Sequence, residues 1–207
     1  LKTKKFENLF SKFIKTKYST MVNSGSSADL LLAQLLSSNF NDKIKKGDEI
    51  LVPCITWPTH IWSIFQAGFV PKLVDIDKHT LNICYDDLQK KISKKTKAIF
   101  IVHLMGNPCN MKKINSICNK NKLILLDDCC EALGARWGSK HVGNFGIGGS
   151  FSFFFSHHLV TMEGGMIVTN RKILADQLKI MRSHGWARDL KKNYPKYKHI
   201  DPRYLFV

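Results

Sequence analysis

The chain has 207 residues, of which 44% are hydrophobic and 23% charged, so it can bury one sizeable core but not two ordinary domains joined by a linker. No long apolar run occurs and the lysine-rich start precedes no apolar segment, so we expect neither a transmembrane helix nor a secretory signal. The formal net charge of +16 comes mostly from lysine, whereas base recognition favours arginine, so we expect an anionic small ligand and no nucleic acid. Six irregularly spaced cysteines without a Cys-x-x-Cys pair are typical of reduced thiols in a cytoplasmic protein.

The hydrophobic pattern alternates between short apolar runs and helical spacing along the chain. In chain order it predicts a helix at residues 6–14, a strand at 18–22, a helix at 28–36, a strand at 49–52, a helix at 58–66, a strand at 72–75, a helix at 86–92, a strand at 98–102, a helix at 111–119, a strand at 123–126, glycine-rich strands at 145–155 and 166–169, and a helix at 174–182. This alternation predicts an α/β fold with a mainly parallel sheet and helices on both faces. Such sheets bind ligands at the carboxyl ends of their strands, so the residues after each strand are the candidates for chemistry.

A Ser-Gly-Ser-Ser turn at residues 24–27 precedes the second predicted helix. Free N–H groups and the helix dipole attract anions at a helix N-terminus, which makes this turn a candidate phosphate site. Serine is also a preferred capping residue, so an ordinary N-cap explains the same pattern. The turn alone does not decide between the two.

Trp57 and the pair Asp127 and Asp128 also follow predicted strands. The ring of Trp57 suits stacking on an aromatic ligand, and it suits core packing as well. A carboxylate at the sheet edge can pair with a cationic ring nitrogen, which would hold the carboxylate ionised. The alternative is that these acids only cap a helix or lie on the surface. Both alternatives stay open for each residue.

Two adjacent histidines, His157 and His158, lie between an apolar strand and a Gly-Gly pair at 164 and 165. Histidine suits proton transfer near neutral pH, which makes one of them a candidate general base. Adjacent histidines rarely bind one ion together and no Cys or His lies at a matching short spacing, so we predict no metal site. A buried structural histidine is the remaining alternative.

Together these segments resemble the DegT/DnrJ/EryC1/StrS family of sugar-nucleotide aminotransferases, which are fold-type I enzymes that use pyridoxal 5'-phosphate (PLP). Five motifs carry the resemblance: Asn-Ser-Gly-Ser-Ser-Ala at 23–28, Val-Pro and Thr-Trp within 52–57, His-Leu-Met-Gly-Asn at 103–107, Asp-Asp-Cys-Cys-Glu-Ala-Leu-Gly at 127–134, and the segment 151–165. The resemblance implies that residues 1–207 form a PLP-binding large domain. It also implies that an N-terminal segment and a small C-terminal domain lie beyond this sequence.

The resemblance further implies roles for individual residues in the cofactor site. The serines would hold the phosphate group, the indole would stack on the ring, and the second aspartate of the pair would bind the ring nitrogen. The implied cofactor-binding residues are Ser26, Ser27, Trp57, Asp128, Glu131 and Ser152.

One position departs from the aminotransferase pattern. The lysine that holds PLP covalently would lie five residues after Ser152 and six before Glu163, where this chain has His157, and no lysine occurs between Lys140 and Lys172. Histidine cannot form that bond, but it can move a proton. The sequence is similar to the family's GDP-4-keto-6-deoxy-D-mannose 3-dehydratase branch, which shares this exchange together with Ser-His-His, Thr-Met-Glu-Gly-Gly and the His-Gly-Trp-x-Arg motif found here at 184–188.

The similarity to this branch implies a 3-dehydratase that uses PLP and its pyridoxamine form, with His157 as the base. It would take an amino group from a donor such as glutamate and deoxygenate a 4-keto-6-deoxy nucleotide sugar for lipopolysaccharide O-antigen. It would work as a cytoplasmic homodimer with a shared active site. A second histidine-bearing branch adds an iron–sulfur cluster, whose cysteine ligands follow the arginine of the His-Gly-Trp-x-Arg motif. In this sequence no cysteine follows Cys130, so the matching stretch offers no ligands for the cluster. An aminotransferase of the same family and a non-catalytic binding or regulatory protein on a degenerate scaffold stay open.

Overall fold

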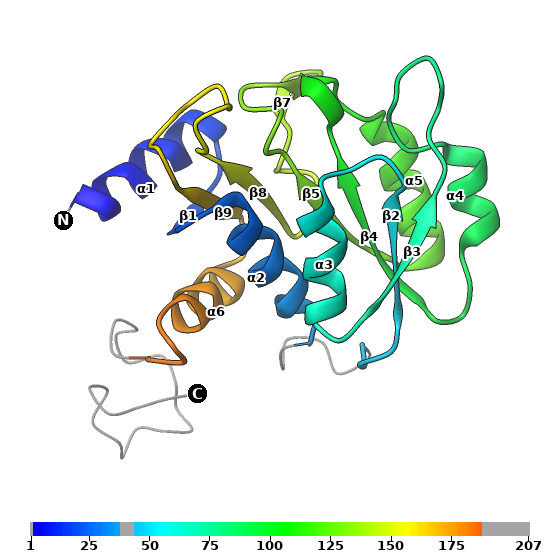
Figure 1. The fold of residues 1–207 in the computed structure, drawn as a ribbon, viewed down its shortest axis with the longest axis horizontal. Coiled ribbons are helices and arrows are strands. Elements are labelled where there is room, and N and C mark those ends of the chain that lie inside the picture. Colours follow the sequence, from blue (N-terminus) through cyan, green and yellow to red (C-terminus); the bar gives the residue numbers. More distant parts are fainter. Residues whose placement is uncertain (1, 38–43, 188–207) are drawn as a thin grey trace.

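A computed structural model describes residues 2–37 and 44–187, which form a seven-stranded sheet in the order β1-β9-β8-β5-β4-β2-β3 (Figure 1). The strands are β1 (Tyr18–Val22), β2 (Glu49–Pro53), β3 (Val70–Val74), β4 (Thr96–Val102), β5 (Ile124–Asp128), β8 (Gly148–Ser152) and β9 (Gly165–Thr169). β9 is antiparallel to both of its neighbours, and the other pairings in this sheet are parallel. The predicted mainly parallel sheet is confirmed. Arg188, which completes the His-Gly-Trp-x-Arg motif, lies outside the described residues.

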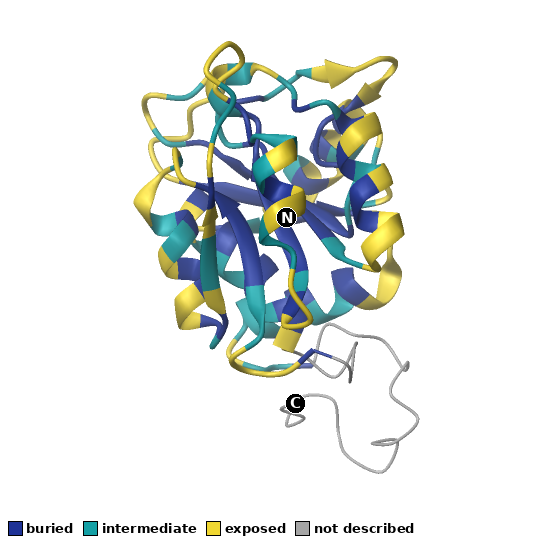
Figure 2. Ribbon diagram, turned by 90° about the vertical axis from the view of Figure 1, so that its right-hand side faces the viewer, coloured by how far each residue is buried: buried dark blue, intermediate teal, exposed yellow. Residues whose placement is uncertain are grey.

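Helices cover both faces of this sheet, as the sequence predicts (Figure 2). One face carries α2 (Gly25–Ser37), α3 (Pro58–Gln66) and α6 (Lys172–Arg182). The other carries α1 (Lys2–Ile14), α4 (Tyr85–Lys91) and α5 (Met111–Asn121). Successive residues of a strand point to opposite faces, so Phe100 of β4 packs beneath α2 and α3 while Ile99 and Ile101 pack beneath α4 and α5. Burial on both faces explains the nearly continuous apolar sequence of the central strands.

Several boundaries differ from the prediction for physical reasons. α2 begins at Gly25 because Ser24 Oγ accepts a hydrogen bond from the Ser27 N–H (3.1 Å) and caps the helix there. β5 continues through Asp127 and Asp128, since its pairing with β4 and β8 extends to these two residues. β8 is shorter than the predicted strand at 145–155, because after its end the chain turns into a loop that returns at Gly165.

Two short elements between these strands were not predicted. They are a hairpin of β6 (Arg136–Trp137) and β7 (Lys140–His141) and a 3-10 turn, η1 (Leu104–Gly106). Elements of two or three residues are too short to show a hydrophobic period. Among the residues that the structure describes, no helix combines the length and apolar character needed to cross a membrane.

Asp127 is a fully buried acid that anchors the chain leading into β8. Its Oδ2 accepts hydrogen bonds from the N–H groups of Gly143 (3.1 Å) and Phe145 (3.3 Å). Burial nevertheless raises the pKa of Asp127 to about 7. The folded state therefore binds this proton more tightly than the unfolded chain, whose carboxyl groups titrate at about 4. The stability that this group contributes is full below about pH 4 and is lost as the pH rises through about 7.

The Asp127→Asn variant removes this titration while keeping an oxygen that can accept the two N–H groups. The measured quantity is the difference in melting temperature, variant minus unmodified protein. We expect this difference to become more positive from about pH 5 to about pH 8, because only the unmodified protein buries a charge at the higher pH. Thermal denaturation at both pH values measures this difference. A difference that is the same at both would contradict the assignment of the titration to Asp127.

Candidate active site

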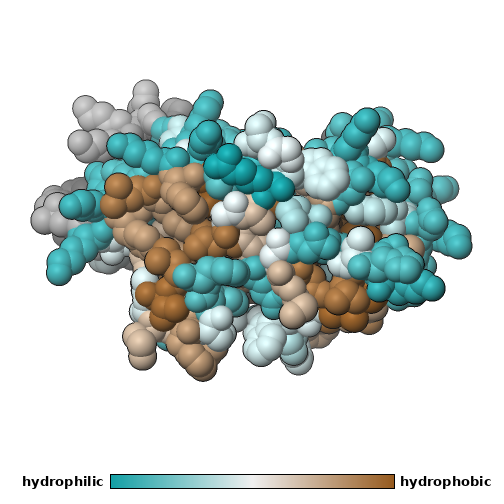
Figure 3. Space-filling model, turned by 90° about the horizontal axis from the view of Figure 1, so that it is seen from above, coloured by the Kyte–Doolittle hydropathy of each residue, from teal (hydrophilic) through white to brown (hydrophobic). Residues whose placement is uncertain are grey.

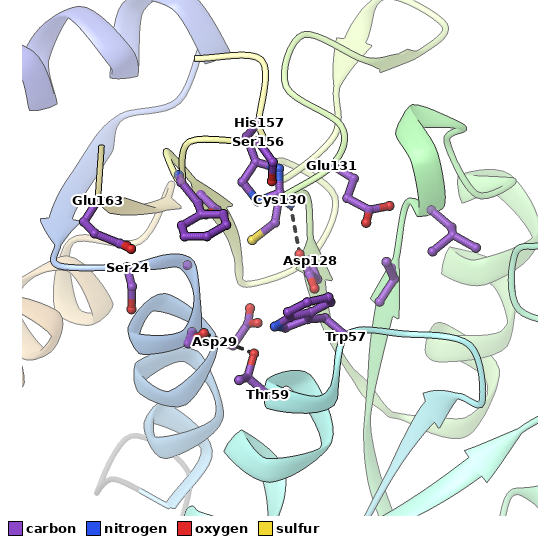
Figure 4. A pocket seen from close by; sticks show the side chains of 16 residues that line it. Ser24, Asp29, Trp57, Thr59, Asp128, Cys130, Glu131, Ser156, His157 and Glu163 are labelled. Carbon is purple, nitrogen blue, oxygen red and sulfur yellow. Dashed lines mark hydrogen bonds between the residues drawn. The ribbon is translucent and has the colours of Figure 1, made fainter. Parts of the chain in front are cut away.

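A cavity of about 400 Å³ opens at the carboxyl ends of the parallel strands, where sheets of this kind bind ligands. Its walls come from the ends of β4, β5 and β8, from the first turns of α2 and α3, and from the loop that follows β8 (Figure 4). Six residues predicted from the sequence line it together: Ser26, Trp57, Asp128, Glu131, Ser152 and His157.

The N-terminus of α2 forms one end of the cavity. The N–H groups of Gly25 and Ser26 lie in the first turn and so have no partner within the helix. Ser26 Oγ donates a hydrogen bond to Thr59 Oγ1 (3.1 Å). Gly25 allows Ser152 to approach, because a Cβ at residue 25 would lie 2.6 Å from Ser152 Cβ and 2.9 Å from its Oγ. N–H groups and hydroxyls thus meet at a helix N-terminus, an arrangement suited to a phosphate group.

Ser27, which was predicted to hold a phosphate group, and its neighbour Ser24 have different surroundings. Ser27 is not among the residues that line the cavity, and its N–H bonds to Ser24 Oγ. Ser24 caps the helix and also lines the cavity. The N-cap and the anion site are therefore compatible, because the cap uses the Ser27 N–H and leaves those of Gly25 and Ser26 free.

Asp128 and Asp29 bring two carboxyl groups to the cavity, with exposed fractions of 4% and 3%. The Cys130 N–H donates to Asp128 Oδ1 (2.9 Å), and the Ser150 hydroxyl donates to Asp29 Oδ1 (2.5 Å). Burial raises the pKa of Asp128 to about 6. Burial, and then the nearby Asp128, raise the pKa of Asp29 well above its usual range. A cationic group in the cavity would lower the pKa of Asp128 and stabilise its ionised form.

Trp57 is not a core residue, since its exposed fraction is 68%. Pro58 occupies the start of α3 and favours the extended backbone that Trp57 adopts. Thr56 Oγ1 lies 2.8 Å from His60 Nδ1, a hydrogen bond that fixes the same turn. In Figure 4 the indole lies next to Asp128 at the cavity. It can therefore stack on a planar ligand whose ring nitrogen faces that carboxyl group.

The two adjacent histidines have different surroundings. His157 is half-buried and lines the cavity, whereas His158 is exposed and does not. Burial lowers the pKa of His157, and the negative charge of Glu131 opposes this shift. The imidazole of His157 is therefore neutral near pH 7 and free to accept a proton.

Glu131 holds the turn η1 against the cavity. Its Oε2 accepts a hydrogen bond from the Met105 N–H at 2.7 Å. Met105 has a φ of 52°, a left-handed conformation that is unfavourable for a residue with a side chain. Leu104, the preceding residue, lines the cavity. The Glu131 carboxylate therefore stabilises a strained segment of the cavity wall.

The charges around the cavity are predominantly negative. Among the residues that the structure describes, the cavity lining includes Asp29, Asp128, Glu131 and Glu163, and it includes no lysine or arginine. Asp29, Thr59 and Cys130 also line it, and none of them was predicted from the sequence as a site residue. Asp29 had a detectable signal, because it is the only charged residue in the sequence of α2. Cys130 lies within the motif at 127–134 but had no signal of its own, and Thr59 had none.

Comparison with known proteins identifies the relatives of this chain. Residues 1–200 match the DegT/DnrJ/EryC1/StrS aminotransferase family. The GDP-4-keto-6-deoxy-D-mannose 3-dehydratase of Yersinia pseudotuberculosis is 43% identical over 197 residues, which cover 95% of this chain and 49% of that protein. The protein of the same name from Escherichia coli O55:H7 is 45% identical over 189 residues, covering 91% and 49%. The solved E coli GDP-4-keto-6-deoxy-D-mannose-3-dehydratase with bound hydrated PLP aligns with a TM-score of 0.92 and 41% identity over 99% of this chain and 54% of that chain.

The sheet order and the position of the cavity define a fold-type I PLP-dependent enzyme fold. The chain belongs to the DegT/DnrJ/EryC1/StrS aminotransferase family. It spans about half the length of the curated relatives that it matches.

The hydrogen bond from Met105 to Glu131 can be tested by amide hydrogen exchange. Glu131→Ala removes the acceptor, and we expect the Met105 amide to exchange about tenfold faster, since a hydrogen bond to a charged group contributes about 1.5 kcal/mol or more. Glu131→Gln keeps an acceptor oxygen and serves as the matched control. Equal exchange at Met105 in Glu131→Ala and the unmodified protein would contradict the role of Glu131 in holding η1.

Proposed function

We propose that this protein is a PLP- and pyridoxamine-phosphate-dependent 3-dehydratase that deoxygenates C3 of a 4-keto-6-deoxy nucleotide sugar. GDP-4-keto-6-deoxymannose is the proposed substrate, because proteins that act on it are 43% and 45% identical to this chain. The observation that carries the proposal is His157 in the wall of the cavity, at the position where aminotransferases of the family have lysine.

The residues around the cavity fit a PLP molecule that is not covalently bound. The N–H groups of Gly25 and Ser26 and the hydroxyls of Ser26 and Ser152 would hold its phosphate. Trp57 would stack on its ring. Asp128 would bind the ring nitrogen, a cationic partner that offsets the cost of burying this carboxylate. No lysine among the described lining residues competes for a covalent bond.

When bound, PLP or its pyridoxamine form would supply an electron sink for the negative charge that develops at C4′. The protein's own residues would supply the proton transfer and the electrostatics. Neutral His157 would remove the proton at C4′ as a general base. Glu131, which raises the pKa of His157 and holds η1, would favour the protonated imidazole that results. Ionised Asp128 would keep the ring nitrogen protonated and so strengthen the electron sink.

The overall reaction balances with glutamate as the amino donor. Replacing the C3 hydroxyl of the sugar by hydrogen consumes two electrons and two protons and releases water. Converting glutamate to 2-oxoglutarate and ammonia consumes one water and supplies the same electrons and protons. The net products are therefore the 3-deoxy-4-keto sugar nucleotide, 2-oxoglutarate and ammonia.

The proposal includes a homodimer whose second subunit completes the active site. Exposed apolar side chains near the cavity support it, among them Trp57, Met105, Phe155 and Met162. Seen from above, the surface shows hydrophobic areas between polar ones (Figure 3). Such residues are typical of a surface that is covered in the assembled protein. A cytoplasmic location and a role in lipopolysaccharide O-antigen synthesis complete the proposal, and both rest on the family resemblance.

The experiment incubates the full-length gene product with PLP, glutamate and GDP-4-keto-6-deoxymannose and determines the mass of the sugar nucleotide. We expect the loss of one oxygen atom together with ammonia release. His157→Asn should reduce this product at least 100-fold, because a general base contributes about that factor or more. The matched control is His158→Asn, which changes the exposed neighbour and should retain the product.

Other masses would contradict the proposal. Replacement of the keto oxygen by an amino group would identify an aminotransferase instead. An unchanged sugar nucleotide in the presence of bound PLP would contradict this substrate, and failure to bind PLP would support a non-catalytic protein on the same fold.

A further inference from the structure

Asp29 is a buried acid to which the proposed mechanism assigns no role. It lies in α2 and faces Asp128 at the end of β5 across the base of the cavity (Figure 4). One side-chain atom from each of Asp29, Asp128 and Cys130 lies within 4.8 Å of those of the other two. Two carboxylates at this separation repel one another strongly when both are buried and ionised.

No cation from the described residues compensates the two acids. The described lining of the cavity contains no lysine or arginine. The titratable groups that act on the pair from the end of β5 and the residues after it are Cys129, Cys130 and Glu131, none of which carries positive charge. From β8, the facing group is the neutral hydroxyl of Ser150. A proton is therefore the charge available to compensate the pair.

The hydrogen bonds around the two acids indicate where that proton resides. Asp128 accepts the Cys130 N–H (2.9 Å) and a further hydrogen bond from the Cys130 side chain, and both favour its ionised form. Asp29 accepts only the Ser150 hydroxyl, on Oδ1, among the hydrogen bonds of the described residues. Its Oδ2 is thus available to carry a proton.

We propose that Asp29 is a positioning residue that holds a proton beside Asp128, so that the cavity presents one carboxylate instead of two to a bound ring nitrogen. This inference deepens the proposed function and rests on it for the identity of the ring. Asp29 would therefore act on the cofactor through Asp128.

The first test measures the proton in the full-length protein without PLP. Infrared spectroscopy at neutral pH should show, besides the C=O component of Asp127, a second component of a protonated carboxylic acid that is lost in Asp29→Asn and retained in Asp128→Asn. The control is Asp127→Asn, which removes a different buried acid and should leave the Asp29 component in place. A band that persists in Asp29→Asn and disappears in Asp128→Asn would place the proton on Asp128 and overturn the proposal.

The second test measures PLP affinity as a function of pH. Loss of the Asp29 proton at high pH adds a charge that holds the proton of the ring nitrogen, and this effect is absent from Asp29→Asn. We expect the ratio of the two dissociation constants, variant over unmodified protein, to increase about tenfold as the pH rises through the range in which the infrared component of Asp29 disappears, which corresponds to a shift of one pKa unit. A ratio independent of pH is what a purely structural role predicts, and it would overturn the proposal.

A second variant covers the case in which Asp29→Asn does not fold. Ser150→Ala keeps Asp29 but removes the hydroxyl that favours its ionised form, so the infrared titration of Asp29 should move to higher pH. An unchanged titration would contradict the proposal. Because the infrared measurements need no cofactor, a protein that binds no PLP would refute the proposed function while leaving the proton on Asp29 separately testable.

Discussion

The close approach of α2 to the ends of β8 and β9 is the constraint on which the site depends. Gly25 leaves no room for a side chain because Ser152 lies against it, and a Cβ at Gly165 would lie 2.2 Å from the Ser24 carbonyl oxygen. These two glycines let the first turn of the helix sit directly over the strand ends. The same contact brings Asp29 to within reach of Asp128. The anion site and the buried acids are therefore products of one packing arrangement.

Replacement of the lysine by His157 changes what the rest of the cavity must do. A covalent bond would hold the cofactor in place whatever the strength of its other contacts. Under the proposed function, the affinity that this bond would supply comes instead from the N-terminus of α2, the indole of Trp57 and the carboxyl group of Asp128. Burial raises the pKa values of Asp29 and Asp128, so a cation that binds in the cavity would stabilise their ionised forms and with them the folded protein. The same replacement places an imidazole with a lowered pKa in the cavity wall, where the proposed reaction needs a general base.

Much of the fold was predictable because its elements are long enough to show a period. The helix at 58–66 and the strand at 18–22 have the predicted bounds, and the alternation of strands and helices specified the mainly parallel sheet. The hairpin of β6 and β7 was not predictable, since two-residue strands have no period. In the site, the position after a strand indicated the pair Asp127 and Asp128 and the two adjacent histidines, and the family resemblance then selected Asp128 and His157, both of which line the cavity. Thr59 and Cys130 could not be found in this way, because their place in the cavity depends on how α3 and the chain after β5 pack against α2.

The claim that the cavity binds PLP without a covalent bond can be tested most directly by borohydride reduction, which makes any bond between a lysine and PLP permanent. The full-length protein is loaded with PLP, freed of excess cofactor, checked by its absorbance for bound PLP, reduced, and weighed by intact-mass spectrometry. We expect bound PLP and a protein mass without any adduct. A mass increased by one reduced cofactor would contradict this expectation and would show that a lysine binds PLP covalently.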